Sequence, residues 1–181
     1  RNKFKFYGMK MQVKRDITNQ HVKKYGLPPE NEFENIIKEM WANEYRDLHH
    51  AAIDILRIYV KNAPKEFMSL LEYLIVHQSW WDSVDGIAPY LVGEMFKKYP
   101  ELMKPYTDKW IESDNIWLQR TAILFQLHWK DKLDVELMTK MILRRKDSKE
   151  FFVQKAIGWI LRQHSKIYPE FVINFVNENK L

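Results

Sequence analysis

The chain has 181 residues, of which 46% are hydrophobic and 29% are charged, a length and composition that suit one domain with its own core. It contains no cysteine, which excludes disulfides, thiolate metal sites and a cysteine nucleophile. The 29 Lys and Arg residues exceed the 24 Asp and Glu residues, and the formal charge of +5 favours a polyanionic partner without identifying it. No apolar run reaches the roughly 18–20 residues that span a bilayer, and we expect a cytoplasmic protein.

Helical segments are predicted along most of the chain. Glycine is scarce, with 5 residues, and apolar residues recur at spacings of three and four from Phe33 onward, which is typical of an all-α protein. Proline fits the first turn of a helix because its missing N–H would have no intrahelical partner there. We therefore expect helices to begin just after Pro28 and Pro29, after Pro64, and at Pro100 and Pro169.

The amphipathic segments between these helix starts are related by a shift of 35 residues. The shift aligns one polar column, made of His50, Asp85, Arg120 and Lys155. A helix pair repeated every 35–45 residues is shared by HEAT, armadillo and tetratricopeptide solenoids, and no tetratricopeptide consensus is present. The prediction is an all-α, right-handed α-solenoid of HEAT-like helical repeats (an α-α superhelix), with about five stacked pairs, the first incomplete.

In such a stack, equivalent positions on successive helices are about 8–10 Å apart. Asp85, Arg120 and Lys155 are therefore expected to be neighbours on one surface, which we expect to be concave. Two interpretations of this row are open. The cations either hold phosphates on both sides of a working acid, or they form salt bridges between repeats, with Arg120 simply neutralising Asp85.

The segment "SWWDSVDGIAPYL" contains Trp81 and Asp85 at a spacing of four, which places both on one helix face. Pro89 has no N–H to donate to the Asp85 carbonyl, so we expect the helix to kink near the acid or to leave that carbonyl free. Taken alone, the motif favours a plainer interpretation, in which Asp85 is an acid near a helix N-terminus that interacts favourably with the helix dipole.

Two further residues extend the predicted surface. Trp159 is one turn beyond Lys155, and Arg162 follows three residues later. A tryptophan within "AIGWILR" is, however, also typical of a core position.

Other catalytic templates are missing from the sequence. There is no phosphate-binding glycine loop, no G-x-S-x-G and no H-E-x-x-H. His49 and His50 are adjacent and so project about 100° apart on a helix, and the other histidines show no ligand-like spacing. We expect no metal and no cofactor.

Three blocks, "SWWDSVD", "SDNIWLQRTAILFQL" and "KEFFVQKAIGWILR", occur in this order on the 35-residue repeat. Together they resemble the AlkD-type DNA alkylation repair glycosylases, and the resemblance runs from about Phe4 to the C-terminus. It implies a solenoid curved around double-stranded DNA. The implied activity is hydrolysis of the N-glycosidic bond of N3- or N7-alkylated purines, such as 7-methylguanine and 3-methyladenine, in base excision repair.

The resemblance also implies roles for particular residues. The catalytic set is Asp85, Trp81, Arg120 and Trp159, with the two indoles packing around the sugar and backbone of the damaged nucleotide and without a deep base-binding pocket. Asp85 is implied to stabilise the developing positive charge on the sugar. The residues expected to contact DNA phosphates are Arg120, Lys155, Arg162, Arg15 and Arg46.

The chain is expected to form a single HEAT-like domain over residues 1–181 and to act as a monomer. The family also has an N-terminal helical segment and a short C-terminal helix, and we expect both to be missing here. The alternative function is a non-catalytic HEAT-repeat scaffold that binds DNA or protein.

Overall fold

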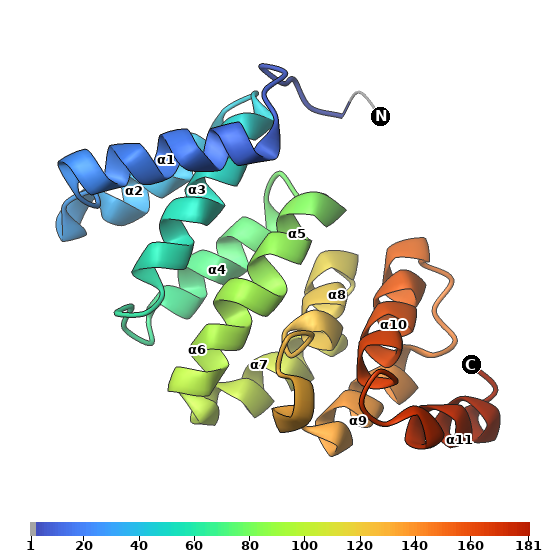
Figure 1. The fold of residues 1–181 in the computed structure, drawn as a ribbon. Coiled ribbons are helices and arrows are strands. Elements are labelled where there is room, and N and C mark those ends of the chain that lie inside the picture. The colour runs from blue at the N-terminus through green and yellow to red at the C-terminus, as the bar shows by residue number, and fades with distance from the viewer. Residues whose placement is uncertain (1–2) are drawn as a thin grey trace.

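The computed structural model describes residues 3–181, which form helices joined by short connections, without a strand (Figure 1). The helices are α1 (Met11–Tyr25), α2 (Glu30–Ala42), α3 (Arg46–Tyr59), α4 (Phe67–Val76), α5 (Trp81–Ile87), the π-helical turn η1 (Ala88–Val92), α6 (Gly93–Lys98), α7 (Pro100–Ile111), α8 (Ile116–Leu124), the 3₁₀ turn η2 (Lys130–Lys132), α9 (Val135–Arg145), α10 (Phe151–His164) and α11 (Pro169–Asn179). The predicted all-α fold is confirmed.

The helices are arranged in two layers. We call α3, α5, η1, α6, α8 and α10 the inner layer; they face the viewer in Figure 1, with α4, α7 and α9 behind them. The packed pairs are α2 with α3, α4 with α5, α7 with α8, and α9 with α10. Four complete pairs therefore follow the single helix α1, which packs on α3, and α11 packs on α10 at the other end.

The predicted repeat appears directly in the contacts between pairs. Side chains bond across neighbouring repeats at sequence separations of 32 to 37 residues, as in Trp41 Nε1 to the His77 carbonyl (2.7 Å, separation 36) and Lys140 to Asp108 (2.8 Å, separation 32). Because these separations stay close to the length of one repeat, each helix pair is held mainly by its neighbours, as in other solenoids.

Proline marks the helix starts as predicted. Pro29 immediately precedes α2, Pro100 and Pro169 occupy the first positions of α7 and α11, and α4 begins three residues after Pro64. No helix within the described residues is both long and apolar enough to cross a membrane.

Pro89 interrupts the α-helical pattern of the second inner helix, as expected. Residues 88–92 form a π-helical turn, in which the Gly93 N–H donates to the carbonyl of Ala88, five residues earlier. A π-turn inserts an extra residue into a helix and often occurs at functional sites. The helix continues as α6, so the break lies one turn after Asp85.

Candidate functional site

Asp85 and Arg120 form a two-pronged ion pair between α5 and α8. Arg120 Nε donates to Asp85 Oδ1 at 2.8 Å, and Nη2 donates to Oδ2 at 2.9 Å. Arg120 Nη1 donates to the carbonyl of Phe152 on α10 at 2.6 Å. A single arginine thus joins three inner helices and fixes the plane of the carboxylate, because bidentate pairing is geometrically specific.

The carboxylate nevertheless remains accessible. The Asp85 side chain is 15% exposed, whereas that of Arg120 is 5% exposed. An ionised carboxylate has about four acceptor sites, of which Arg120 occupies two. Asp85 can therefore still accept a hydrogen bond from a water molecule or approach a positive centre.

Trp81 borders this carboxylate on the same helix. It is exposed to 47%, a large fraction for an indole. Its neighbour Trp80 packs against Trp117 and Phe152, with ring centroids 5.8 and 5.2 Å from those of the two rings. Trp117 is buried and the other two rings are partly buried, and this aromatic cluster holds the start of α5 while the Trp81 ring stays exposed.

Burial raises the pKa of the Asp85 carboxyl above its ordinary value of 3.8. The hydrogen bonds and charge of Arg120 act in the opposite direction, and the negative charge of Asp82 reinforces the rise. The loss of hydration disfavours the charged form. A carboxylate in such surroundings is a stronger proton acceptor than one in water.

A second, largely buried polar network lies beside the pair. Arg46 Nη2 donates to Asp82 Oδ1 at 2.6 Å, and His50 Nε2 lies 3.0 Å from Asp82 Oδ2. Lys14 Nζ is 3.1 Å from His50 Nδ1. Because an ammonium group has no acceptor, His50 accepts at Nδ1 and donates from Nε2 to Asp82. The network connects α1, α3 and the first turn of α5.

Arg46 does not fit its predicted role. Its side chain is 0% exposed and bonds to Asp82, to the carbonyl of Gln78 and to Ser83. In this structure the guanidinium therefore offers no surface to a DNA phosphate, and nothing here supports the expected contact. The Arg120 side chain is likewise almost buried, at 5% exposure, and its N–H groups donate to Asp85 and to the Phe152 carbonyl.

The remaining predicted residues are placed differently. Lys155 and Arg162 on α10 are exposed, with the Lys155 ammonium 5.3 Å from the Phe151 ring. Trp159 is half-buried and packs against the core. Arg15 pairs with Asp54 at 3.1 Å and is 40% exposed. The predicted row is thus a bonded pair, Asp85 and Arg120, followed by an exposed lysine.

Sequence reasoning missed Asp82 and Tyr90. A signal for Asp82 was present, because Arg46 and Asp82 are separated by 36 residues, the repeat distance. Tyr90 follows Pro89 in the π-turn and is 40% exposed. Within residues 3–181, no three His, Asp or Glu side chains gather as a metal site would require.

The two layers and the Asp85 site define the class: a helical-repeat protein with an oriented acid and an exposed indole on its inner layer. The sequence profile of the DNA alkylation repair enzyme family matches residues 1–181. The chain belongs to this family of DNA repair enzymes.

Solved structures agree with this assignment. A predicted DNA alkylation repair enzyme from Enterococcus faecalis is 28% identical, with a TM-score of 0.87 over 97% of this chain and 82% of the other. AlkD2 from Streptococcus mutans is 17% identical, with a TM-score of 0.70 over 93% and 81% of the two chains, and shows the similarity of the fold. The smu.31 structure from Streptococcus mutans UA159 is also 17% identical, with a TM-score of 0.68 over 92% and 86%. No curated protein matches the chain.

Proposed function

We propose that the protein is a DNA glycosylase that hydrolyses the N-glycosidic bond of N3- or N7-alkylated purines in duplex DNA. The observation that carries the proposal is the Asp85 carboxylate, which Arg120 orients from two sides and which remains partly exposed beside Trp81. In this proposal the protein acts as a monomer in the cytoplasm and needs no cofactor.

The chemistry suits a site with a carboxylate and no strong acid. Alkylation at N7 or N3 makes the purine cationic, so the base leaves with the electron pair of the C1′–N bond and becomes neutral. Positive charge develops on the deoxyribose, where Asp85 stabilises it electrostatically, as carboxylates do in glycoside hydrolysis. Water then attacks C1′ and gives its proton to Asp85, leaving a free base and an abasic sugar.

The other residues have supporting roles. Trp81 and Trp159 offer aromatic faces to the electron-poor sugar, an interaction worth about 1 kcal/mol each. Arg120 acts as a positioning residue that keeps the carboxylate in one orientation. Lys155 and Arg162, both exposed on α10, contact DNA phosphates.

Release of 7-methylguanine from methylated duplex DNA tests the proposal. The wild-type protein should release the base and leave abasic sites, and Asp85→Asn should abolish most of the release because the neutral amide stabilises positive charge poorly. Asp108→Asn is the matched control, since Asp108 is also paired, with Lys140 at 2.8 Å, but belongs to α7 in the outer layer. Equal release by the wild type and Asp85→Asn would remove Asp85 from the mechanism.

A non-catalytic scaffold is the second candidate, and one observation favours it. Arg120 neutralises Asp85 within a nearly buried ion pair, which is also how a purely structural salt bridge between repeats would look. The scaffold predicts DNA binding with a steep salt dependence and no released base from the wild type.

A further inference from the structure

The inner layer also contains two buried arginines, Arg46 and Arg120. Arg57, near the end of α3, differs from both. The N–H groups of Arg46 and Arg120 donate hydrogen bonds to carboxylates and backbone carbonyls. Arg57 is 27% exposed, and its contact with Asp54 is long, 3.9 Å from Nη1 to Oδ1. Asp54 is closer to Arg15, at 3.1 Å. Within residues 3–181 the Arg57 guanidinium makes no hydrogen bond, so its N–H donors are not used by the protein itself.

The orientation of Arg57 is fixed by Tyr90. The guanidinium carbon lies 3.5 Å from the centroid of the Tyr90 ring. The Tyr90 ring also lies near His128, with ring centroids 4.8 Å apart. A guanidinium held against an aromatic ring keeps its N–H edge free for a bidentate acceptor. Tyr90 reaches this position from the π-turn that Pro89 introduces.

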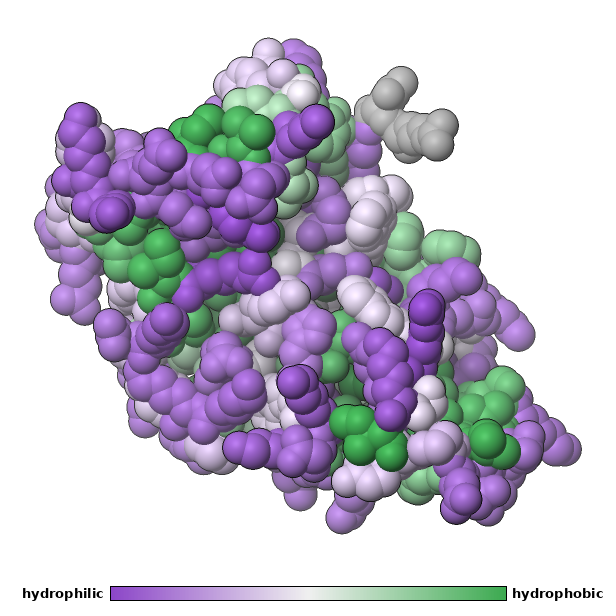
Figure 2. All heavy atoms as spheres, viewed as in Figure 1, coloured by the Kyte–Doolittle hydropathy of each residue, from purple (hydrophilic) through white to green (hydrophobic). Residues whose placement is uncertain are grey.

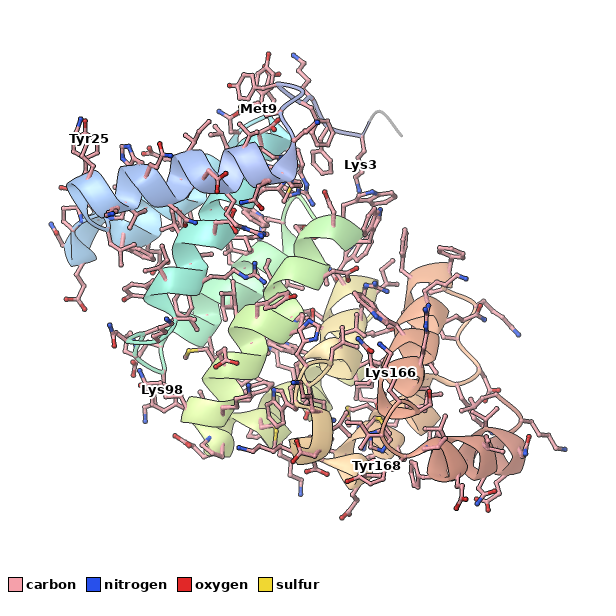
Figure 3. The ribbon with its side chains drawn as sticks, viewed as in Figure 1. Lys3, Met9, Tyr25, Lys98, Lys166 and Tyr168 are labelled. Carbon is pink, nitrogen blue, oxygen red and sulfur yellow. The ribbon has the colours of Figure 1, made fainter. Side chains whose placement is uncertain are left out.

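The backbone around the cluster is anchored. Lys98, at the end of α6, donates to the carbonyl of Ala63 at 2.8 Å, and Tyr99 Oη donates to the same carbonyl at 3.1 Å. Figure 3 shows Lys98 beside the turn that joins α3 to α4. These bonds fasten the end of α6 to the end of α3, so that Arg57 and Tyr90 approach each other from connected elements.

Two cations, Arg57 and Lys97, lie near the His128 ring. The pKa of His128 is lowered by its burial and by the charges of Arg57 and Lys97, which shows that both cations act on the same ring. Lys97 also pairs with Glu94 at 2.7 Å, and the acid nearest to Arg57 is Asp54, at 3.9 Å, which is closer to Arg15. Figure 2 shows mostly hydrophilic side chains over the central part of this face.

We propose that the cluster of Arg57, Tyr90 and His128 is a phosphate subsite that binds the backbone of the DNA held at Asp85. This inference rests on the proposed function for its ligand. Tyr90 is five residues beyond Asp85, across the junction of α5 and η1, or roughly 7.5 Å along the axis at about 1.5 Å per residue. This distance corresponds to about two nucleotide steps of 3.4 Å, so the subsite takes a phosphate near the damaged nucleotide. Arg57 thus takes a phosphate-binding role that Arg120 cannot take, because the Arg120 side chain is almost buried, at 5% exposure.

Salt titrations of binding to unmodified duplex DNA test the subsite. Each phosphate contact contributes about 0.9 to the slope of log K against log salt, so Arg57→Gln should lower the slope by about 1 and weaken binding roughly eightfold at 0.1 M salt. Tyr90→Leu should also weaken binding because the guanidinium loses its support, whereas Tyr90→Phe keeps the ring and should bind like the wild type. Thermal melting of each variant shows whether it is folded.

The control is Lys104→Gln, which removes one exposed cation from α7 in the outer layer and should leave the slope unchanged. An unchanged slope and affinity in folded Arg57→Gln, or a wild type that does not bind duplex DNA, would overturn the subsite. Base release is measured separately. A wild type that binds DNA with this Arg57 dependence but releases no base supports the subsite and contradicts the glycosylase.

Discussion

At Asp85, burial and a neighbouring cation oppose each other. Burial disfavours the carboxylate, Arg120 favours it, and burial is the larger effect on the pKa. Asp82 is only three residues away, yet its pKa is held well below the ordinary value. Burial also acts against the charged form of Asp82, but the hydrogen bonds from His50 and Arg46 and the charge of Arg46 outweigh it. The pKa values of the two carboxyl groups are therefore shifted in opposite directions, although the groups are only three residues apart.

The raised pKa of Asp85 predicts the pH dependence of base release. The active form is the carboxylate, so the single-turnover rate should fall on acidification through a midpoint above 3.8. Asp85→Asn should lose this step and retain only a low, flat rate. Circular dichroism at each pH separates this effect from unfolding. A rate that rises on acidification would instead indicate that protonated Asp85 acts as an acid.

Asp82 predicts a pH-dependent change in stability. Its pKa is lower in the folded state, so its contribution is full above the unfolded value near 3.8 and is lost as the pH falls further. Asp82→Asn leaves the Arg46 charge buried and poorly paired, which should lower the free energy of unfolding by about 3 kcal/mol at pH 7. Denaturant titrations should show this difference shrinking below pH 3.8.

The control for Asp82 is Asp147→Asn, because Asp147 is exposed in the connection after α9 and should change stability little. A loss in Asp82→Asn that stayed constant or grew with acid would contradict the assignment of the ion pair.

At the scale of elements, the close approach of α6 to α8 depends on Gly93. A Cβ at this position would lie 2.3 Å from the carbonyl oxygen of Phe125, so the two backbones would have to separate. Gly158 on α10 is the matched contrast, because a Cβ there meets nothing within 4 Å. The same residue type is thus required at one site and replaceable at the other.

This contrast predicts opposite effects of the same substitution. Gly93→Ala should lower the free energy of unfolding by about 2 kcal/mol through overpacking, whereas Gly158→Ala should raise it by up to about 1 kcal/mol through better helix propensity. Equilibrium denaturation of both variants measures the difference. Equal effects of the two substitutions would show that α6 and α8 can separate without a loss in the free energy of unfolding.

The elements also show where prediction from sequence succeeds and where it fails. The 35-residue shift predicted the partnership of Asp85 and Arg120, because equivalent helix positions become neighbours in a stack. It did not predict that Arg46 would be buried while Arg57 kept free donors. Both arginines belong to one amphipathic helix, and their burial depends on contacts with Asp82 and Tyr90 from the next repeat. Pro89 predicted a break in the helix, but only the structure showed that the break positions Tyr90.

At the scale of the whole molecule, the stack places its chemistry on one layer. Asp85, Trp81, Arg57, Tyr90 and Lys155 all belong to inner helices, although they come from three different segments of the chain. The outer helices carry salt bridges between repeats, such as Lys109 to Glu72 at 2.6 Å. Membership of the DNA alkylation repair family indicates a polyanionic partner for the protein, and the net charge of +5 agrees in sign.

The most direct test of the account is single-turnover release of 7-methylguanine at saturating enzyme, measured for the wild type and Asp85→Asn together with the DNA affinity of each. The account predicts that Asp85→Asn lowers the rate by about 100-fold or more, the scale expected for losing a main electrostatic contact in the transition state, while DNA affinity changes little. Equal rates at equal affinity, or no release by the wild type, would contradict it.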